Sequence, residues 1–250
     1  MLPASDPVAY GENVGDFYDM LYPAHEVPDV VAFVRGHVAE GARIVEFGTG
    51  TGRVAVPLAE HGYEVHGMDA SPAMLDILKS KDPAGLVTVH TADFTRDVVG
   101  RDFDLCLLVN NTLFMMPSQD EQRTVLRRAA EHVAPGGLLV VECYEPTFFH
   151  ALTGPHTQSS IISADKLLID TIQCDPASQT VVYLRSLVSG GHVRTFPEVS
   201  RYSWPAEVDL MAKVEGFEPV ERWADWRQAP FDRSAKRFIS VYRRTGGPES

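Results

Sequence analysis

The feature that most constrains the fold of this chain is a regular alternation of short apolar runs and amphipathic stretches between residues 43 and 141. The apolar runs predict buried strands, and the amphipathic stretches predict helices. Strands are expected at residues 43–47, 64–68, 86–91, 103–109 and 138–141. Helices are expected between them at residues 54–61, 71–79 and 120–133. Strands that alternate with helices form a mostly parallel, doubly wound sheet, so the predicted fold class is α/β.

A different pattern begins after about residue 157, where predicted strands follow one another without helices between them. Residues 166–173, 181–188 and 192–202 are expected to be strands, and Asp175-Pro176 and Gly190-Gly191 mark turns between them. Such neighbours pair antiparallel. A helix at 205–214 and strands at 220–223 and 237–242 are expected to follow. We therefore predict a core domain at 1–156 and 204–245, with residues 1–40 as a helical cap, and an antiparallel β insertion at 157–203 that forms a substrate lid.

The composition excludes several classes of function. The chain has 22 Lys and Arg against 34 Asp and Glu, a net charge of −12, and no basic block, so a nucleic-acid partner is not expected. Cys106, Cys143 and Cys174 form no CxxC pair, and no residues have the spacing of metal ligands, so no metal is expected. No apolar run approaches the roughly 18 residues of a membrane span, and the N-terminus does not resemble a signal peptide. We therefore expect a cytoplasmic protein with no membrane partner.

The most informative motif is a glycine-rich segment, Val45-Glu46-Phe47-Gly48-Thr49-Gly50-Thr51-Gly52-Arg53, where a predicted strand leads into a predicted helix. Glycines at such a turn let the backbone approach a ligand, and the helix N-terminus offers free N–H groups to an anion. The spacing is GxGxG and not the GxGxxG of dinucleotide-binding enzymes. Glu46 would repel a pyrophosphate and suits a ligand with an ammonium group. By itself, the motif is equally compatible with a simple tight turn.

Two more carboxylates follow the next two predicted strands. Asp69 ends the second strand, 21 residues after Gly48, where a carboxylate can accept hydrogen bonds from both hydroxyls of a ribose. Asp93-Phe94 follows the third strand, where it could contact an adenine amino group and ring. Ligands of open α/β sheets bind outside the carboxyl ends of the strands, which disfavours the simple-turn interpretation. Together these residues predict a ligand with adenine, a ribose and an amino-acid tail, which describes S-adenosylmethionine.

On these residues the chain resembles the class I S-adenosylmethionine-dependent methyltransferases. The resemblance rests on the segments 46–52, 69–75 and 92–94, and beyond residue 145 on the order of elements alone. It implies a Rossmann-like methyltransferase fold with a seven-stranded sheet, and S-adenosylmethionine as the cofactor. The β insertion and the Tyr10…Tyr18-Asp19…Tyr22 pattern also resemble the amino-sugar N-methyltransferases of antibiotic biosynthesis. Phe114 stands near the position where some sugar-modifying relatives have a histidine.

The resemblance also implies roles for particular residues. The methionine end of the cofactor would be held by Glu46, Gly48, Thr49, Gly50 and Gly52. The ribose would be bound by Asp69, and the adenine by Ala70, Met74, Asp93 and Phe94. Val109 and Asn110 would lie beside the methyl group. Tyr10 and Tyr18 would close over the cofactor, although these tyrosines equally suit a role in capping the edge of the sheet. The methyl acceptor would contact Tyr22, Asn111, Phe114, Glu145, Phe148 and Phe149.

Methyl transfer from a sulfonium requires mainly alignment of the nucleophile, and a general base only where the nucleophile must lose a proton. The candidate catalytic residues are Tyr18, His150 and His192. The predicted function is methyl transfer to N, O or C of a small, mostly apolar metabolite in secondary metabolism. A fold relative that binds the same cofactor but catalyses a cyclisation or other non-methylating reaction would have identical motifs.

Two further classes fit less well. A protein methyltransferase or a non-catalytic binding module is disfavoured because the chain has no peptide-binding extension. An NAD dehydrogenase is disfavoured by the glycine spacing and by Glu46. A homodimer formed through the β insertion is a further hypothesis.

Overall fold

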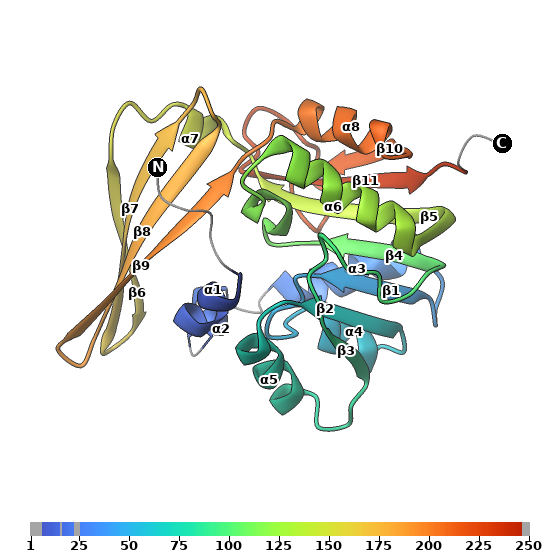
Figure 1. Ribbon diagram of the computed structural model, residues 1–250, viewed down its shortest axis with the longest axis horizontal. Helices are drawn as coiled ribbons and strands as arrows, with labels where there is room; N and C mark the ends of the chain where they lie inside the picture. The colour runs from blue at the N-terminus through green and yellow to red at the C-terminus, as the bar shows by residue number, and fades with distance from the viewer. Residues whose placement is uncertain (1–6, 16, 23–25, 247–250) are drawn as a thin grey trace.

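The computed structural model describes residues 7–15, 17–22 and 26–246, and its centre is a seven-stranded sheet (Figure 1). The strand order is β10-β11-β5-β4-β1-β2-β3. β1 to β5 run parallel, and β11 pairs antiparallel with both β5 and β10. The predicted doubly wound, mostly parallel seven-stranded sheet is therefore confirmed. The strands are β1 (Arg43–Phe47), β2 (Glu64–Asp69), β3 (Val87–Thr91), β4 (Phe103–Leu108), β5 (Val133–Tyr144), β10 (Phe217–Trp223) and β11 (Arg237–Arg244).

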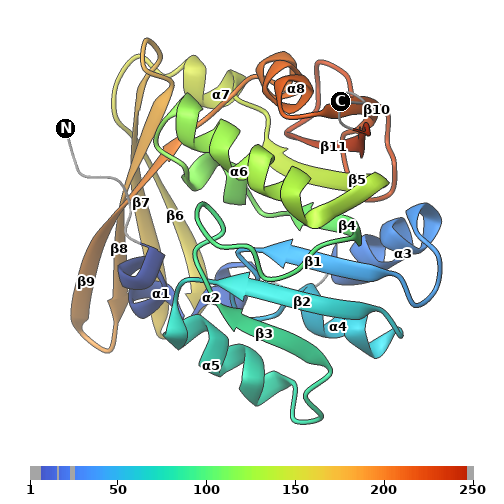
Figure 2. The ribbon, with the colours of Figure 1, turned by 45° about the vertical axis from the view of Figure 1, so that its right-hand side comes forward.

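Helices cover both faces of this sheet, because its central strands are apolar on both sides. Along β4, Leu105 and Leu107 belong to one buried cluster, whereas Cys106 and Leu108 belong to the other. The first cluster is covered by α3 (Val27–His37), α4 (Ala55–Glu60) and α5 (Pro72–Lys81), and the second by α6 (Gln119–His132) and α8 (Pro205–Val214). The layers can be followed in Figure 2. In the described ranges, no helix is long and apolar enough to cross a membrane.

The reversal of strand order lies between β1 and β4, because the chain proceeds from β1 to β2 and β3 on one side and continues with β4 and β5 on the other. In open α/β sheets, a crevice forms at this point outside the carboxyl ends of the strands. The α5 helix begins at this edge as the sequence predicts. Ser71 is its N-cap, where the hydroxyl oxygen accepts a hydrogen bond from Met74 N at 3.4 Å, and Pro72 occupies the first turn.

The β5 strand is longer than the sequence predicts. It begins at Val133 and contains Pro135-Gly136-Gly137, which lies between the helix expected at 120–133 and the strand expected at 138–141. Val133 pairs with Phe103, and the register between β4 and β5 shifts before Leu105 pairs with Leu138. This irregularity accommodates the Pro-Gly-Gly segment, so its turn-like composition marks a bulge and not the end of a strand.

A second, four-stranded antiparallel sheet lies beside the core, with its strands in sequence order (Figure 1). We call it the inserted sheet; its strands are β6 (His156–Ser163), β7 (Lys166–Asp175), β8 (Thr180–Ser189) and β9 (His192–Arg201). The sequence analysis predicted its last three strands but missed β6. That strand lies at the edge of the sheet and is largely exposed, so its Gln158-Ser159-Ser160 segment lacks the apolar alternation of a half-buried strand.

Two short N-terminal helices, α1 (Pro7–Val14) and α2 (Tyr18–Leu21), lie between the inserted sheet and α5 (Figure 1). Val14 and Phe17 pack in one buried cluster with Met74 of α5 and with Leu168, Leu187 and Phe196 of the inserted sheet. The Thr51 hydroxyl donates to Asp19 Oδ1 at 2.7 Å, which ties α2 to the glycine-rich turn. The N-terminal segment is therefore held against the edge of the core sheet where the predicted site residues lie.

Candidate active site

The glycine-rich turn follows β1 directly, and its three glycines all have positive φ angles. At Gly52, a Cβ atom would lie 2.6 Å from Leu78 Cγ, so this glycine lets the turn pack closely on α5. At Gly50, where φ is +54°, a Cβ atom would meet no heavy atom closer than 4.0 Å. The backbone at Gly50 therefore faces open space, as a ligand-binding turn requires.

The carboxylate of Glu46 is buried beneath this turn, and Glu46 as a whole is only 2% exposed. The Thr49 hydroxyl donates a hydrogen bond to Glu46 Oε2 at 2.9 Å. Burial raises the pKa of Glu46 to about 7, although the hydrogen bond from Thr49 and the charge of Arg53 act in the opposite direction. The hydrogen bond from Thr49 and the charge of Arg53 thus offset only part of the unfavourable free energy of burying this carboxylate.

This raised pKa predicts a pH-dependent loss of stability in the ligand-free protein. Between pH 4.5 and about 7 the folded state keeps a proton on Glu46 that the unfolded chain has lost, so stability falls as pH rises through this window. Between pH 4.5 and pH 8 we expect the wild type to lose about 3 kcal/mol of unfolding free energy relative to Glu46→Gln. Urea denaturation at both pH values measures this. Parallel pH profiles of the two proteins would contradict it.

Asp69 ends β2 beside the turn, and both of its carboxylate oxygens accept backbone hydrogen bonds. Gly50 N donates to Oδ2 at 2.9 Å, and Ser71 N donates to Oδ1 at 2.8 Å. Burial raises the pKa of Asp69, whereas these two hydrogen bonds lower it. One carboxylate therefore fixes both the turn after β1 and the start of α5 while it faces the same cavity as Gly50.

Asp93 and Phe94 follow β3 at the same edge of the sheet. Asp93 Oδ1 accepts hydrogen bonds from Thr95 N at 2.9 Å and from the Thr95 hydroxyl at 2.6 Å. The Phe94 ring stacks on Phe47 of β1, with ring centroids 5.5 Å apart and planes 11° apart. These contacts hold a carboxylate and an aromatic ring side by side at the cavity wall.

Asn110 and Asn111 follow β4, and both adopt left-handed backbone conformations with φ of 53° and 65°. Asparagine tolerates this region better than most residues, but surrounding contacts must hold it there. Glu142 supplies two of them: its Oε2 accepts from Asn110 N at 2.9 Å, and its carbonyl accepts from Asn111 N at 3.1 Å. Tyr144 N donates to Asn111 Oδ1 at 2.7 Å. Asn110 Nδ2 donates to the Tyr18 hydroxyl at 2.7 Å, which connects β4 to α2.

These residues surround a cavity of about 960 Å³, counting the part open to solvent, which we call the central cavity. It is lined by Tyr10, Tyr18, Tyr22, Gly48, Gly50, Asp69, Ala70, Met74, Asp93, Phe94, Asn110, Asn111, Thr112, Met115, Met116 and Glu198. A recess of about 280 Å³ shares Tyr18, Gly48, Asn110 and Thr112 with it, and adds Glu46, Thr49, Arg53, Val54 and Val109. The structure thus brings together all the predicted cofactor-binding residues except Gly52. Two of the predicted acceptor-binding residues, Tyr22 and Asn111, line the central cavity as well.

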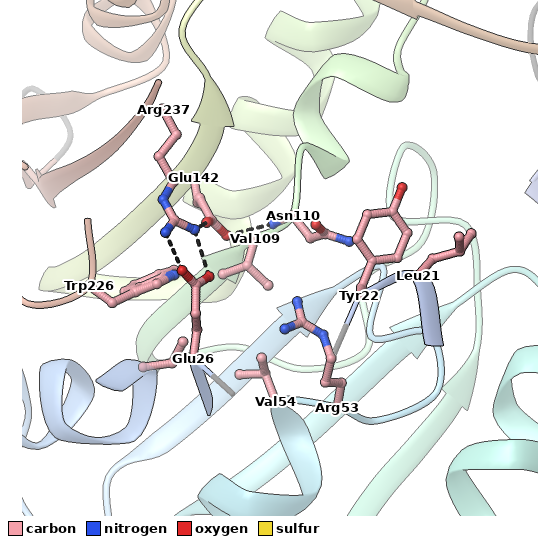
Figure 3. A pocket seen from close by; sticks show the side chains of 11 residues that line it. Leu21, Tyr22, Glu26, Arg53, Val54, Val109, Asn110, Glu142, Trp226 and Arg237 are labelled. Atoms are coloured by element: carbon pink, nitrogen blue, oxygen red, sulfur yellow. Dashed lines mark hydrogen bonds and ion pairs between the residues drawn. The ribbon is translucent and has the colours of Figure 1, made fainter. Parts of the chain in front are cut away.

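A polar chamber of about 650 Å³ borders this region, and Figure 3 shows its lining side chains. Arg237 binds both Glu26 and Glu142 there, donating from Nη1 to Glu26 Oε2 at 2.8 Å and to Glu142 Oε1 at 2.9 Å. Arg53 points into the same space, and within the described part of the chain no hydrogen bond or ion pair engages it. Arg53 is therefore a cation available to a ligand next to the glycine-rich turn.

The structure does not bring the two predicted catalytic histidines to the central cavity. His150 lies on α7 (Thr147–His150), where its Nδ1 is 2.7 Å from the Tyr202 hydroxyl and its ring contacts Trp204. His192 is exposed at the start of β9 and lines a separate surface depression with Lys166. Tyr18 does line the cavity, but burial raises its pKa well above the usual tyrosine value, so its hydroxyl stays protonated.

Four predicted acceptor-binding residues also lie elsewhere. Phe114 is fully buried in the core, where its ring contacts Tyr144 and Phe238. Glu145 accepts hydrogen bonds from Thr147 N and Oγ1, both at 2.9 Å, at the start of α7. Phe148 is exposed, and Phe149 packs against Tyr144 and Tyr183. In the described residues these side chains line neither the central cavity nor the recess, because the segment after β5 leads away into the inserted sheet.

Sequence reasoning missed several residues that line these spaces. Arg53 follows the last glycine of the motif directly, and its charge could have been recognised there. Met115 and Met116 belong to the segment around a short 3-10 helix (Thr112–Met115), and Glu198 belongs to β9. No local pattern indicates that these last three face the cavity. Within the described ranges, no group of three His, Cys, Asp or Glu side chains could hold a metal ion.

Comparisons with known proteins agree with this geometry. Residues 44–137 match the family model described as a methyltransferase domain. The structure of the CcbJ methyltransferase from Streptomyces caelestis is 36% identical, with a TM-score of 0.90, over 97% of this chain and 100% of that chain. This chain belongs to the S-adenosylmethionine-dependent methyltransferases. Its cofactor is accordingly S-adenosylmethionine.

Two curated relatives are also similar to this methyltransferase. The cypemycin N-terminal methyltransferase of a Streptomyces species is 28% identical over 246 residues, 96% of this chain and 99% of that protein. The dTDP-4-amino-2,3,4,6-tetradeoxy-D-glucose N,N-dimethyltransferase of Saccharopolyspora spinosa is 30% identical over 139 residues, 53% of this chain and 55% of that protein. The enzyme is therefore related to N-methyltransferases of antibiotic biosynthesis, as the sequence analysis expected.

Proposed function

We propose that this enzyme transfers the methyl group of S-adenosylmethionine to an amine nitrogen of a small molecule in secondary metabolism. The observation that carries the proposal is the central cavity, which lies at the carboxyl ends of the core strands beneath α1, α2 and the inserted sheet. Its lining combines aromatic and apolar side chains with a few polar groups, as small-molecule sites typically do. Nitrogen is favoured over oxygen and carbon because both curated relatives above are named as N-methyltransferases.

The residues of the cavity fit S-adenosylmethionine in chemistry and in order. Asp69 would bind the ribose hydroxyls, and Asp93 would accept from the adenine amino group. The adenine ring would pack on Ala70, Met74 and Phe94. The open backbone at Gly50 supports this assignment, because no side chain there obstructs a ligand.

The amino-acid end of the cofactor suits the recess under the turn. The buried carboxylate of Glu46 would complement the ammonium group, and Arg53 would complement the carboxylate. Gly48, Thr49, Val109 and Asn110 would complete the recess. When bound, S-adenosylmethionine supplies a methyl group on a positively charged sulfur. The protein's own contribution is to align the acceptor and exclude water, and such positioning can supply on the order of 7–11 kcal/mol.

Tyr10, Tyr18 and Tyr22 would position the acceptor. Burial raises the pKa of each of these phenols, so at neutral pH they donate hydrogen bonds and do not act as bases. The Tyr18 hydroxyl already accepts from Asn110 Nδ2, so its proton remains available to a ligand. Met115, Met116 and Phe94 provide apolar walls, consistent with an acceptor that is mostly apolar around its amine.

A labelled-methyl assay tests this function. The enzyme is incubated with methyl-labelled S-adenosylmethionine and a panel of candidate acceptors. The panel contains amino sugars and dipeptides with a free α-amino group, and each compound is matched with its N-acetyl derivative. We expect label on free amines, with a mass gain of one methylene per transfer, and none on the acetylated compounds. Label found only on oxygen or carbon would contradict N-methylation. A transformed substrate without label would indicate the non-methylating alternative.

A further inference from the structure

The inner face of the inserted sheet carries three charged side chains that the cofactor residues described above do not use. Asp170 lies on β7, Arg185 on β8 and Glu198 on β9, and their residues are 6%, 7% and 8% exposed. Every second residue of an antiparallel strand faces the same side, which places the three on one face. The same face carries Leu168, Leu187 and Phe196, which are buried against the N-terminal helices, and Arg194, whose guanidinium lies 5.3 Å from the centre of the Phe17 ring.

In this cluster, two carboxylates share one guanidinium group. Asp170 is directly opposite Arg185, and Glu198 is opposite Tyr183 in the next pair of the same face. Arg185 Nε lies 3.2 Å from Glu198 Oε2 and 3.7 Å from Asp170 Oδ1. Among the described residues, none of these three buried atoms has a hydrogen-bond partner. The cluster therefore has a formal net charge of −1 and unused hydrogen-bonding capacity.

Such a cluster is a poor way to stabilise a sheet. Burying ions is unfavourable unless each is fully paired and hydrogen-bonded, and well-packed apolar residues would generally serve as well or better. Burial raises the pKa of Glu198, although Arg185 lowers it and so favours its charged form. Arg185 also interacts with Tyr22, which lines the central cavity, so the cluster lies against the ligand space with one carboxylate charge in excess.

Glu198 is the member of the cluster that reaches the ligand space. Among the described residues it is the inserted sheet's contribution to the lining of the central cavity. The other lining residues come from the N-terminal segment, from the ends of the core strands, and from α5 and the 3-10 helix that follow them. Glu198 interacts electrostatically with Tyr10 and Tyr22, which line the same cavity. Its carboxylate is thus on the side of the cavity formed by the N-terminal segment and the inserted sheet.

We propose that Glu198 is the specificity-determining residue for the methyl acceptor and that it binds a basic amino group of that molecule. The proposal rests on the proposed N-methyl transfer and adds the group that selects an amine. The Glu198 carboxylate would accept a hydrogen bond from the amine, and the positive charge of an ammonium form would offset the net negative charge of the cluster. Arg185 would hold Glu198 in place from behind while it remains paired with Asp170.

The cationic sulfur of S-adenosylmethionine is a competing partner for the same carboxylate, and the test must separate the two. S-adenosylhomocysteine lacks this charge, so the protein is first saturated with it. Cyclohexylamine, which is an ammonium ion at pH 7.5, and its neutral near-isostere cyclohexanol are then titrated, and their dissociation constants are measured by ligand-observed NMR. These probes require no turnover, so the result is independent of the labelled-methyl assay.

We expect the wild type to bind cyclohexylamine at least about tenfold more tightly than cyclohexanol, and Glu198→Gln to reduce this ratio to about one. Glu215→Gln is the matched control, because Glu215 is an equally buried carboxylate paired with an arginine, Arg123, outside the cavity. It should keep the wild-type ratio. Glu198→Met is a second variant that leaves Arg185 paired one-to-one with Asp170.

The affinity for S-adenosylhomocysteine should stay within about twofold in all variants, which verifies that they are folded. A wild type without preference for the ammonium probe would overturn the proposal, as would a preference that survives in both Glu198 variants. A specific loss of S-adenosylmethionine affinity relative to S-adenosylhomocysteine, with the ammonium preference retained, would assign Glu198 to the cofactor instead. Failure of the labelled-methyl assay alone would refute N-methylation but leave the amine preference standing.

Discussion

Replacing Gly50 with valine should lower the affinity for S-adenosylmethionine by at least about 100-fold, or about 3 kcal/mol, while the fold is retained. Gly50 has a φ of +54° and lines the central cavity, and a Cβ there would meet no heavy atom closer than 4.0 Å. A β-branched residue is disfavoured in this backbone region by about 1–2 kcal/mol, and its methyl groups would occupy ligand space. Movement of the turn would also disturb the hydrogen bond from Gly50 N to Asp69. Isothermal titration calorimetry measures the affinity.

Gly85→Val is the matched control for this substitution. Gly85 has a φ of +65° in the exposed turn between α5 and β3, and a Cβ there would meet no atom within 4 Å. It should lose about 1–2 kcal/mol of stability from the same backbone strain, with normal cofactor affinity. Near-normal binding by Gly50→Val would show that no ligand approaches this backbone.

The second large effect is expected for Asp69→Ala. The substitution removes the proposed ribose acceptor and leaves the N–H groups of Gly50 and Ser71 without their partner. Hydrogen bonds to charged groups contribute about 1.5–3 kcal/mol, so affinity for S-adenosylmethionine should fall about 10- to 100-fold. We also expect a loss of about 1–3 kcal/mol in unfolding free energy. Calorimetry and urea denaturation measure the two quantities.

Asp82 offers a close control, because its carboxylate also accepts two backbone hydrogen bonds. Leu86 N and Val87 N donate to it at 3.0 and 2.8 Å, at the opposite end of α5 from the cavity. Asp82→Ala should lose comparable stability but keep its cofactor affinity. If the two variants bind S-adenosylmethionine equally well, Asp69 has a structural role alone.

Much of the core could be predicted because its strands are apolar on both faces. The run at β4 is one example, since alternate residues from Leu105 to Leu108 enter two separate buried clusters, and Asp104 is the one exposed residue of the strand. By contrast, β6 is an exposed edge strand whose residues need only pair through the backbone, so its side chains carry no periodic signal. The extension of β5 through Pro135-Gly136-Gly137 depends on a register shift with β4, and a shift of this kind is set by the partner strand.

Some residues of the candidate site could likewise be predicted from the sequence, and others could not. Glu46, Asp69 and Asp93 could be predicted to meet because parallel strands bring their carboxyl ends to one edge. Glu198 and Met115 reach the cavity from the inserted sheet and from a 3-10 helix, and their positions depend on tertiary packing. The positions of the two candidate histidines also depend on tertiary packing. His150 is chemically suited to act as a base, but its side chain bonds to Tyr202 outside the cavity.

The most direct test of the account is a crystal structure of the enzyme with S-adenosylhomocysteine. We predict that its ribose hydroxyls lie within hydrogen-bond distance of Asp69, its adenine contacts Asp93 and Phe94, and its amino-acid end lies between Glu46 and Arg53. Density for the ligand in the polar chamber bounded by Glu26 and Arg237, with the space beside Gly50 filled by solvent, would contradict it.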